Sequence, residues 1–163
     1  MRGIDISEAM VEGYNSMARA AWQPEVMRAV RGDLLSNNEI GPAEEFSNFD
    51  VAVISMALHH VSDSQELISK LVALLQHNGV VVVLDWVPGA TDQEPTKHHD
   101  VHHTIAKGSF SKADMVDIFT KAGCKATGMA YYEYPETTTI PEDVSGVDGG
   151  VEKRLFIAWA RRA

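Results

Sequence analysis

Cysteine and basic residues are both scarce in this 163-residue sequence. The one cysteine, Cys124, excludes an intrachain disulfide and is interpreted as a buried structural thiol, which fits a cytoplasmic protein. Lys and Arg number 14 against 23 Asp and Glu, so the net charge is −9, with no basic run. This balance argues against nucleic acid and against an anionic membrane surface as partners.

Long hydrophobic stretches are also missing. The longest apolar run, 80–84, is far too short to cross a bilayer, and the first ten residues contain no apolar core of a signal peptide. The length suits a single domain covering 1–163.

Short apolar runs alternate with amphipathic segments along the chain. This alternation predicts an α/β fold with a mostly parallel, Rossmann-like sheet flanked by helices. The predicted strands are 3–6, 26–30, 49–55, 80–86, 125–134 and 154–161, and the predicted helices are 8–19, 64–76 and 111–122. Residues 87–104 are predicted as a surface loop, and 135–150 as a flexible hairpin connection.

Five sequence pieces occur in a familiar order. They are Gly-Ile-Asp-Ile-Ser-Glu-Ala-Met at 3–10, Gly-Asp at 32–33, Phe-Asp-Val-Ala-Val-Ile-Ser at 49–55 with Leu-His-His-Val behind it, Leu-Leu-Gln-His-Asn-Gly-Val-Val-Val-Val-Leu-Asp at 74–85, and Phe-Ser-Lys-Ala-Asp-Met at 110–115. Together they resemble the class I S-adenosylmethionine-dependent methyltransferases, most of all the small-molecule branch with the ubiquinone and menaquinone methyltransferases. The resemblance implies S-adenosylmethionine as cofactor and a small organic molecule as methyl acceptor.

The resemblance also implies where the cofactor binds. Asp5, with Ile6 beside it, would hold the ribose hydroxyls, as an acid after a strand does in nucleotide-binding sheets. Asp33 would bind the adenine amino group, Leu34 would pack on the ring, and Ser55 would line the cofactor site. The local alternatives are that Asp5 caps the following helix and that Asp33 is a turn residue.

Residues after the strand at 49–55 are expected to face the substrate, since ligands bind at the carboxyl ends of parallel strands. His59 or His60 is a candidate general base, because imidazole titrates near neutral pH. Met56, Trp86 and Tyr132 are candidates for the substrate pocket, with an ordinary core role as the alternative.

Four histidines gather at 98–103, where helical spacing would place several imidazoles on one face. Neither cysteine nor a His-Glu-x-x-His pattern supports zinc, so no metal is expected. We assign His99 and His102 to the substrate pocket, and His103 is a third candidate base.

The sequence lacks the acid-x-Gly-x-Gly-x-Gly turn that such enzymes place after their first strand. We therefore expect the first strand and helix of the usual fold to be missing, which would leave two strands without a neighbour. A homo-oligomer or a partner chain completing the sheet is predicted. The functional alternative is a non-methylating member of the fold, either a pseudoenzyme or a cofactor-independent cyclase or pericyclase that uses the pocket alone.

Overall fold

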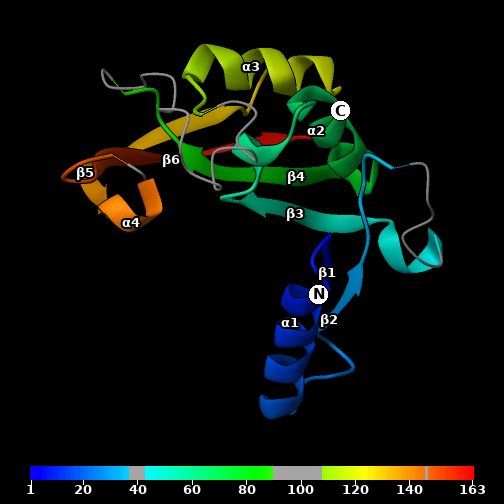
Figure 1. The fold of residues 1–163 in the computed structure, drawn as a ribbon. Coiled ribbons are helices and arrows are strands. Elements are labelled where there is room, and N and C mark those ends of the chain that lie inside the picture. Colours follow the sequence, from blue (N-terminus) through cyan, green and yellow to red (C-terminus); the bar gives the residue numbers. More distant parts are fainter. Residues whose placement is uncertain (37–42, 90–107, 146) are drawn as a thin grey trace. The chain divides into compact units, whose positions relative to one another are not determined.

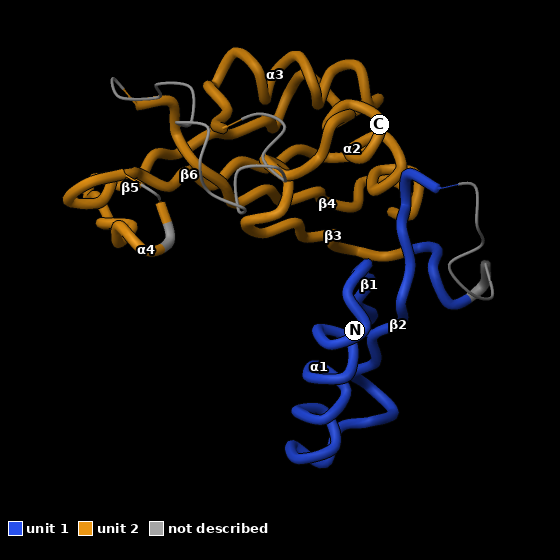
Figure 2. Tube along the Cα trace, viewed as in Figure 1, with its two compact units in different colours: residues 1–48 blue, residues 49–163 orange. Residues whose placement is uncertain are grey.

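The computed structural model describes residues 1–36, 43–89, 108–145 and 147–163. The chain forms two compact units, Met1–Asn48 (unit 1) and Phe49–Ala163 (unit 2), which Figure 2 distinguishes. Each unit contains its own sheet. Helices and strands alternate as expected, which confirms the α/β class. No helix in these ranges is long and apolar enough to cross a membrane.

Unit 1 is a strand–helix–strand motif whose two strands pair in parallel (Figure 1). Its elements are β1 Arg2–Asp5, α1 Glu8–Ala20, β2 Arg28–Arg31 and the 3-10 helix η1 Ala43–Phe46. The helix begins where predicted, because the Ser7 hydroxyl accepts a hydrogen bond from the backbone N–H of Met10. The second strand begins two residues later than predicted. Val26 and Met27 belong instead to a turn in which both backbone N–H groups donate to the carbonyl of Gln23.

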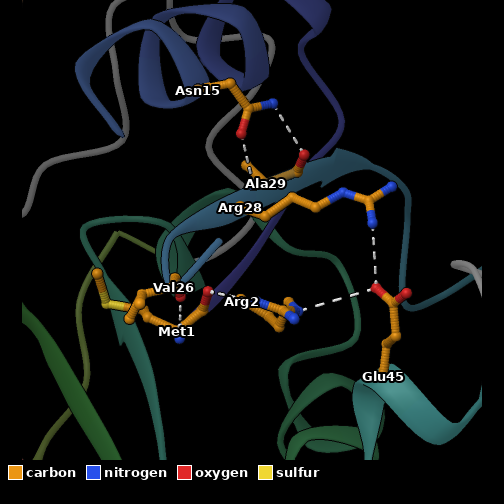
Figure 3. A network of polar contacts seen from close by, with 7 residues as sticks. All are labelled: Met1, Arg2, Asn15, Val26, Arg28, Ala29 and Glu45. Carbon is orange, nitrogen blue, oxygen red and sulfur yellow. Dashed lines mark hydrogen bonds and ion pairs between the residues drawn. The ribbon is translucent and has the colours of Figure 1, made fainter. Parts of the chain in front are cut away.

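Two polar side chains, Asn15 and Glu45, hold the parts of unit 1 together (Figure 3). The Asn15 side chain on α1 both accepts from the backbone N–H of Ala29 (2.8 Å) and donates to its carbonyl (3.0 Å), so it occupies both backbone groups of one β2 residue. The Glu45 carboxylate on η1 lies 3.3 Å from the Arg28 guanidinium and 3.8 Å from that of Arg2. Helix, strands and η1 are therefore joined by side chains as well as by the β ladder.

Unit 2 is a four-stranded sheet of order β3-β4-β6-β5 with α2 and α3 on one side (Figure 1). Its elements are β3 Phe49–Ser55, the 3-10 helix η2 Leu58–His60, α2 Ser64–Ala73, β4 Leu75–Trp86, α3 Lys112–Lys121, β5 Ala130–Ile140, α4 Glu142–Ser145 and β6 Val151–Arg161. β3 is parallel to β4, and β6 is antiparallel to both β4 and β5. Three strands thus run one way and one runs back, which agrees with a mostly parallel sheet.

Several boundaries in unit 2 differ from prediction, among them the start of β5, which is Ala130 and not residue 125, and that of β6, which is Val151 and not residue 154. Asn78 and Gly79 were expected to end the helix at 64–76, but α2 ends at Ala73 and the two residues lie within β4. Gly79 is required there, because a Cβ at this position would lie 2.9 Å from the carbonyl oxygen of Phe49. The segment 135–150 is only partly a connection, since β5 continues to Ile140 and α4 follows.

The β ladders assign each strand residue to one of two faces. On the first face, which α2 and α3 cover, lie buried side chains such as Val81, Val83, Phe156 and Ala158. We call the second face the open face. Its paired positions are Val51, Val53 and Ser55 on β3, Val80, Val82, Leu84 and Trp86 on β4, Ala130, Tyr132, Thr138 and Ile140 on β5, and Val151, Lys153, Leu155, Ile157, Trp159 and Arg161 on β6.

Candidate functional site

In unit 1, the two predicted nucleoside-binding acids follow neighbouring parallel strands. Asp5 ends β1, and Asp33 lies two residues after β2. The backbone N–H of Gly32 donates to the carbonyl of Asp5 (3.0 Å), which extends the ladder beyond the strand ends. The structure therefore brings Asp5 and Asp33 to the same edge of the sheet, where ligands of such folds bind.

Each acid also has a local role. Asp5 Oδ1 accepts from the backbone N–H of Ser7 (2.7 Å), so Asp5 orients the helix cap and is not itself the cap. Asp33 Oδ1 accepts from the backbone N–H of Leu35 (2.8 Å), which is the turn contact foreseen as an alternative. Within the described ranges, the Oδ2 atom of neither acid has a protein donor. Both carboxylates thus retain one oxygen for a ligand.

The other residues assigned to the cofactor are less constrained. Ile6 is 71% exposed beside Asp5, and Leu34 is half-buried beside Asp33. Ser55, at the end of β3, is exposed in unit 2. An exposed isoleucine and a half-buried leucine next to two acids provide apolar surface of the kind that a purine ring covers.

In unit 2, the chain turns sharply after β3. Met56 has a left-handed backbone (φ +53°), and its N–H still donates to the carbonyl of Leu84 (2.9 Å), so the turn begins while the strand is paired. The 3-10 turn η2 follows immediately, closed by the N–H of His60 donating to the carbonyl of Ala57. Leu58 is fully buried at its start and anchors the turn.

This turn places His59 against the carboxylate of Asp85 on β4. Nδ1 of His59 lies 2.8 Å from Asp85 Oδ1, and the His59 backbone N–H donates to Asp85 Oδ2 (3.2 Å). The backbone N–H of Trp86 donates to Oδ1 as well (2.8 Å). Asp85 is completely buried and His59 is 7% exposed. Three donors around one carboxylate explain how a charged group is accommodated in the core.

The hydrogen bond to Asp85 selects one tautomer of the His59 imidazole. A carboxylate can only accept, so Nδ1 of His59 carries the proton that faces Asp85. The lone pair of a neutral ring then belongs to Nε2, on the side of the ring away from Asp85. His60, which is exposed, stacks obliquely on it with ring centroids 4.1 Å apart.

Sequence reasoning had not assigned Asp85 to the site. Its signal was present, because it is the one charged residue in the run Val80–Trp86 and follows His59 by 26 positions. A buried acid on the face of a strand that helices cover needs hydrogen-bond donors, and a nearby histidine can supply one.

The predicted pocket residues of unit 2 are spread across the open face. Trp86 is half-buried at the end of β4. Tyr132 is on β5, in register with Ile157, Leu84 and Ser55, so two strands separate it from β3. Tyr132 shares a face with Ser55 and Trp86 but does not adjoin them.

Tyr131, next in sequence, faces the helix side. Its ring stacks on Phe156 with centroids 4.7 Å apart, and its hydroxyl donates to the carbonyl of Phe110 (2.9 Å). Burial, reinforced by the nearby carboxylates of Glu133 and Asp114, raises the pKa of Tyr131 to about 12. It is therefore a half-buried, hydrogen-bonded packing residue rather than an acid or base.

His99, His102 and His103 lie outside the described residues. In the ranges that the structure does describe, no three His, Cys, Asp or Glu side chains are grouped as metal ligands would be.

Comparisons with known proteins find similar sequences. Residues 1–81 match a family model described as a methyltransferase domain. An uncharacterised methyltransferase of Schizosaccharomyces pombe is 33% identical over 128 residues, which cover 74% of this chain and 44% of that protein. This chain thus spans less than half the length of that relative.

Solved structures extend the likeness to the fold. The YcgJ protein of Bacillus subtilis superimposes on 99% of this chain and 81% of its own, with a TM-score of 0.70 and 15% identity. The chain has the Rossmann-like methyltransferase fold. A S-adenosylmethionine-dependent methyltransferase from Methanosarcina mazei (TM-score 0.63, 13% identity, 99% of this chain and 81% of that one) shares it. So does the [4+2]-cyclase SpnF (TM-score 0.64, 15% identity, 99% and 65%).

Proposed function

We propose that this protein transfers a methyl group from S-adenosylmethionine to a small organic acceptor. The observation that carries the proposal is the placement of Asp5 and Asp33 at the carboxyl ends of adjacent parallel strands, each with one carboxylate oxygen without a protein donor in the described residues. The methyltransferase family model spans the same segment and supports it.

The residues of unit 1 suit the nucleoside end of the cofactor. The Oδ2 atom of Asp5 can accept from ribose hydroxyls, and that of Asp33 from an exocyclic amino group. Ile6 and Leu34 offer apolar surface beside them. When bound, S-adenosylmethionine supplies a sulfonium-activated methyl group.

His59 is the residue that we assign to proton removal from the acceptor. Asp85 fixes its ring and its Nδ1 proton, so Nε2 is the atom that takes a proton from an acidic hydroxyl or carbon acid. The positive charge that forms on the imidazolium is balanced by the buried Asp85 carboxylate. His60 is exposed, whereas His59 is held in the core by Asp85, so we rank His60 behind His59.

Ligand titration tests the cofactor part of this proposal. Asp5→Ala removes the acceptor of two charge-assisted hydrogen bonds to ribose, and S-adenosylhomocysteine binding is expected to weaken roughly 10- to 1000-fold. Glu12→Ala, at an exposed position of α1, is the matched control and should bind as the parent does. Equal affinity for the parent and Asp5→Ala would contradict the assignment.

A cofactor-independent pocket is the second candidate function. One observation supports it: SpnF, a [4+2]-cyclase, shares the fold. In that case the unit 2 residues would hold one conformer of a substrate, and Asp5 would only orient the Ser7 cap.

The two functions separate in one mutant. If Asp5 is structural only, Asp5→Ala should lower the free energy of unfolding by about 0.5–2 kcal/mol. Substrate conversion would then continue without any methyl donor. An Asp5→Ala protein that no longer binds S-adenosylhomocysteine would instead support the methyltransferase assignment, whatever stability it loses with the Ser7 contact.

A further inference from the structure

The ladder between β3 and β4 stops one residue pair short of the end of β4. The N–H of Met56 donates to the carbonyl of Leu84, and the chain then turns away into η2. Alternate residues of a strand direct their backbone groups to the same edge, so Trp86 is the next residue of β4 that faces β3. Both backbone groups of Trp86 therefore need partners from outside β3.

Two other groups take those positions. The Trp86 N–H donates to Oδ1 of Asp85 (2.8 Å), and the Trp86 carbonyl accepts from the backbone N–H of Phe110 (2.9 Å). Phe110 lies just before α3, and its side chain is fully buried. The carboxylate that orients His59 is thus bound by a residue that Phe110 in turn holds in place.

Phe110 is itself held by Tyr131 on β5. The Tyr131 hydroxyl donates to the Phe110 carbonyl (2.9 Å), and its ring stacks on Phe156, the β6 residue in register with Asp85. Because the pKa of Tyr131 is raised to about 12, the hydroxyl stays protonated near neutral pH and remains a donor. Tyr131 therefore reaches the carboxylate by two routes, one of hydrogen bonds through Phe110 and Trp86 and one of packing through Phe156.

We propose that Tyr131 is a positioning residue for the pair formed by His59 and Asp85, and that it acts through Phe110 and the end of β4. This inference rests on the proposed function, in which Nε2 of His59 takes the proton of the acceptor. Hydrogen bonds in a chain polarise one another, so fixing one end of the chain strengthens the contact at the other. All the contacts involved lie within unit 2.

NMR of the imidazole nitrogens in the isotope-labelled 163-residue chain tests this coupling. At about pH 8, above the ordinary pKa of a histidine, the spectra give the ratio of the two neutral tautomers of His59. The Nδ1–H tautomer should dominate in the parent. Tyr131→Phe keeps the stacked ring and removes only the hydroxyl, and the ratio of Nδ1–H to Nε2–H should fall about 2- to 10-fold, which is the effect of one net hydrogen bond. Tyr134→Phe removes an exposed hydroxyl from the same strand and should leave the ratio unchanged.

This readout separates positioning from a merely structural role. A structural role would lower the free energy of unfolding but leave the tautomer ratio of the folded protein as it is. A ratio in Tyr131→Phe within about 1.5-fold of the parent, or an equal fall in Tyr134→Phe, would overturn the proposal.

A double-mutant cycle with Asp85→Asn tests the route of the coupling. In the Asp85→Asn background, Tyr131→Phe should change the ratio by less than about 1.5-fold, because the carboxylate through which it acts is gone. An undiminished effect there would also overturn the proposal. If Asp85→Asn does not fold, the comparison of Tyr131→Phe with Tyr134→Phe still decides. No cofactor or acceptor is present in these measurements, so their failure is distinct from a failure of the S-adenosylhomocysteine titration with Asp5→Ala.

Discussion

Replacing Asp85 by alanine removes the acceptor of three hydrogen bonds at once. His59 Nδ1, the His59 backbone N–H and the Trp86 backbone N–H all lose their partner in a site that excludes water. Each unsatisfied buried donor costs about 1–3 kcal/mol, so the loss of three together costs about 3 kcal/mol or more. We expect Asp85→Ala to lower the free energy of unfolding by about 3–5 kcal/mol, a large part of the roughly 5–15 kcal/mol that a domain has.

Urea unfolding followed by tryptophan fluorescence measures this loss, because Trp86 and Trp159 both lie in unit 2. Asp50→Ala is the control: Asp50 is an exposed strand carboxylate that accepts from the Gln76 side chain, and its loss should cost less than about 0.5 kcal/mol. If the free energies of unfolding of the two variants lie within about 1 kcal/mol of each other, Asp85 is not a fully desolvated hydrogen-bond acceptor. The inference that Asp85 orients the His59 ring would then also be wrong.

Three further outcomes are expected. Burial raises the pKa of the Cys124 thiol from 9.0 to about 11, so iodoacetamide should label it far more slowly in native protein than in urea at pH 8. Because the folded state favours the protonated thiol, its contribution to the free energy of unfolding is complete below pH 9 and is lost as the pH rises toward 11. The 163-residue chain should bind S-adenosylmethionine more weakly than the low micromolar range by calorimetry, since the glycine-rich turn is absent from its sequence; tighter binding would show that this turn is dispensable. Gly79→Ala should lower the free energy of unfolding by about 1–3 kcal/mol through contact with a carbonyl, whereas Gly13→Ala, with open space on α1, should raise it by about 0.5–1 kcal/mol.

Local signals in the sequence were sufficient for most elements. Ser111 was predicted to cap a helix, and it forms a capping box in which its hydroxyl accepts from the Asp114 N–H while the Asp114 carboxylate accepts from the Ser111 N–H. The β3 bounds at 49–55 were also predicted correctly, because a short run of β-forming residues has few alternatives.

Prediction failed where a short sequence motif is compatible with two different structures. Asn78 does adopt a left-handed backbone (φ +64°), as expected of a helix terminator, but β4 continues through it because the Phe49 carbonyl packs against Gly79. Pro135 was expected to end a strand. It lies in β5 at a register shift, on the outermost strand of the sheet, where a missing N–H removes no ladder bond.

The candidate site could be predicted only in part, for a similar reason. Asp5 and Asp33 follow strands, so their location at the sheet edge could be inferred from periodicity. The contact between His59 and Asp85 joins positions 26 residues apart and depends on the left-handed turn at Met56, which no local pattern encodes. Long-range pairs of this kind depend on strand register, and single-sequence patterns do not determine register.

The position of β6 has a consequence for the order in which unit 2 can fold. β6 is the last strand in the sequence but lies between β4 and β5, so until it is in place β5 has no neighbouring strand and β4 pairs only with β3. Its contacts close very long loops: the Arg161 side chain reaches the Asn78 carbonyl 83 residues earlier, and Arg162 reaches that of Ala73 across 89. Loop closure of this length slows folding, so a nascent chain would expose the β4 edge until synthesis reaches β6.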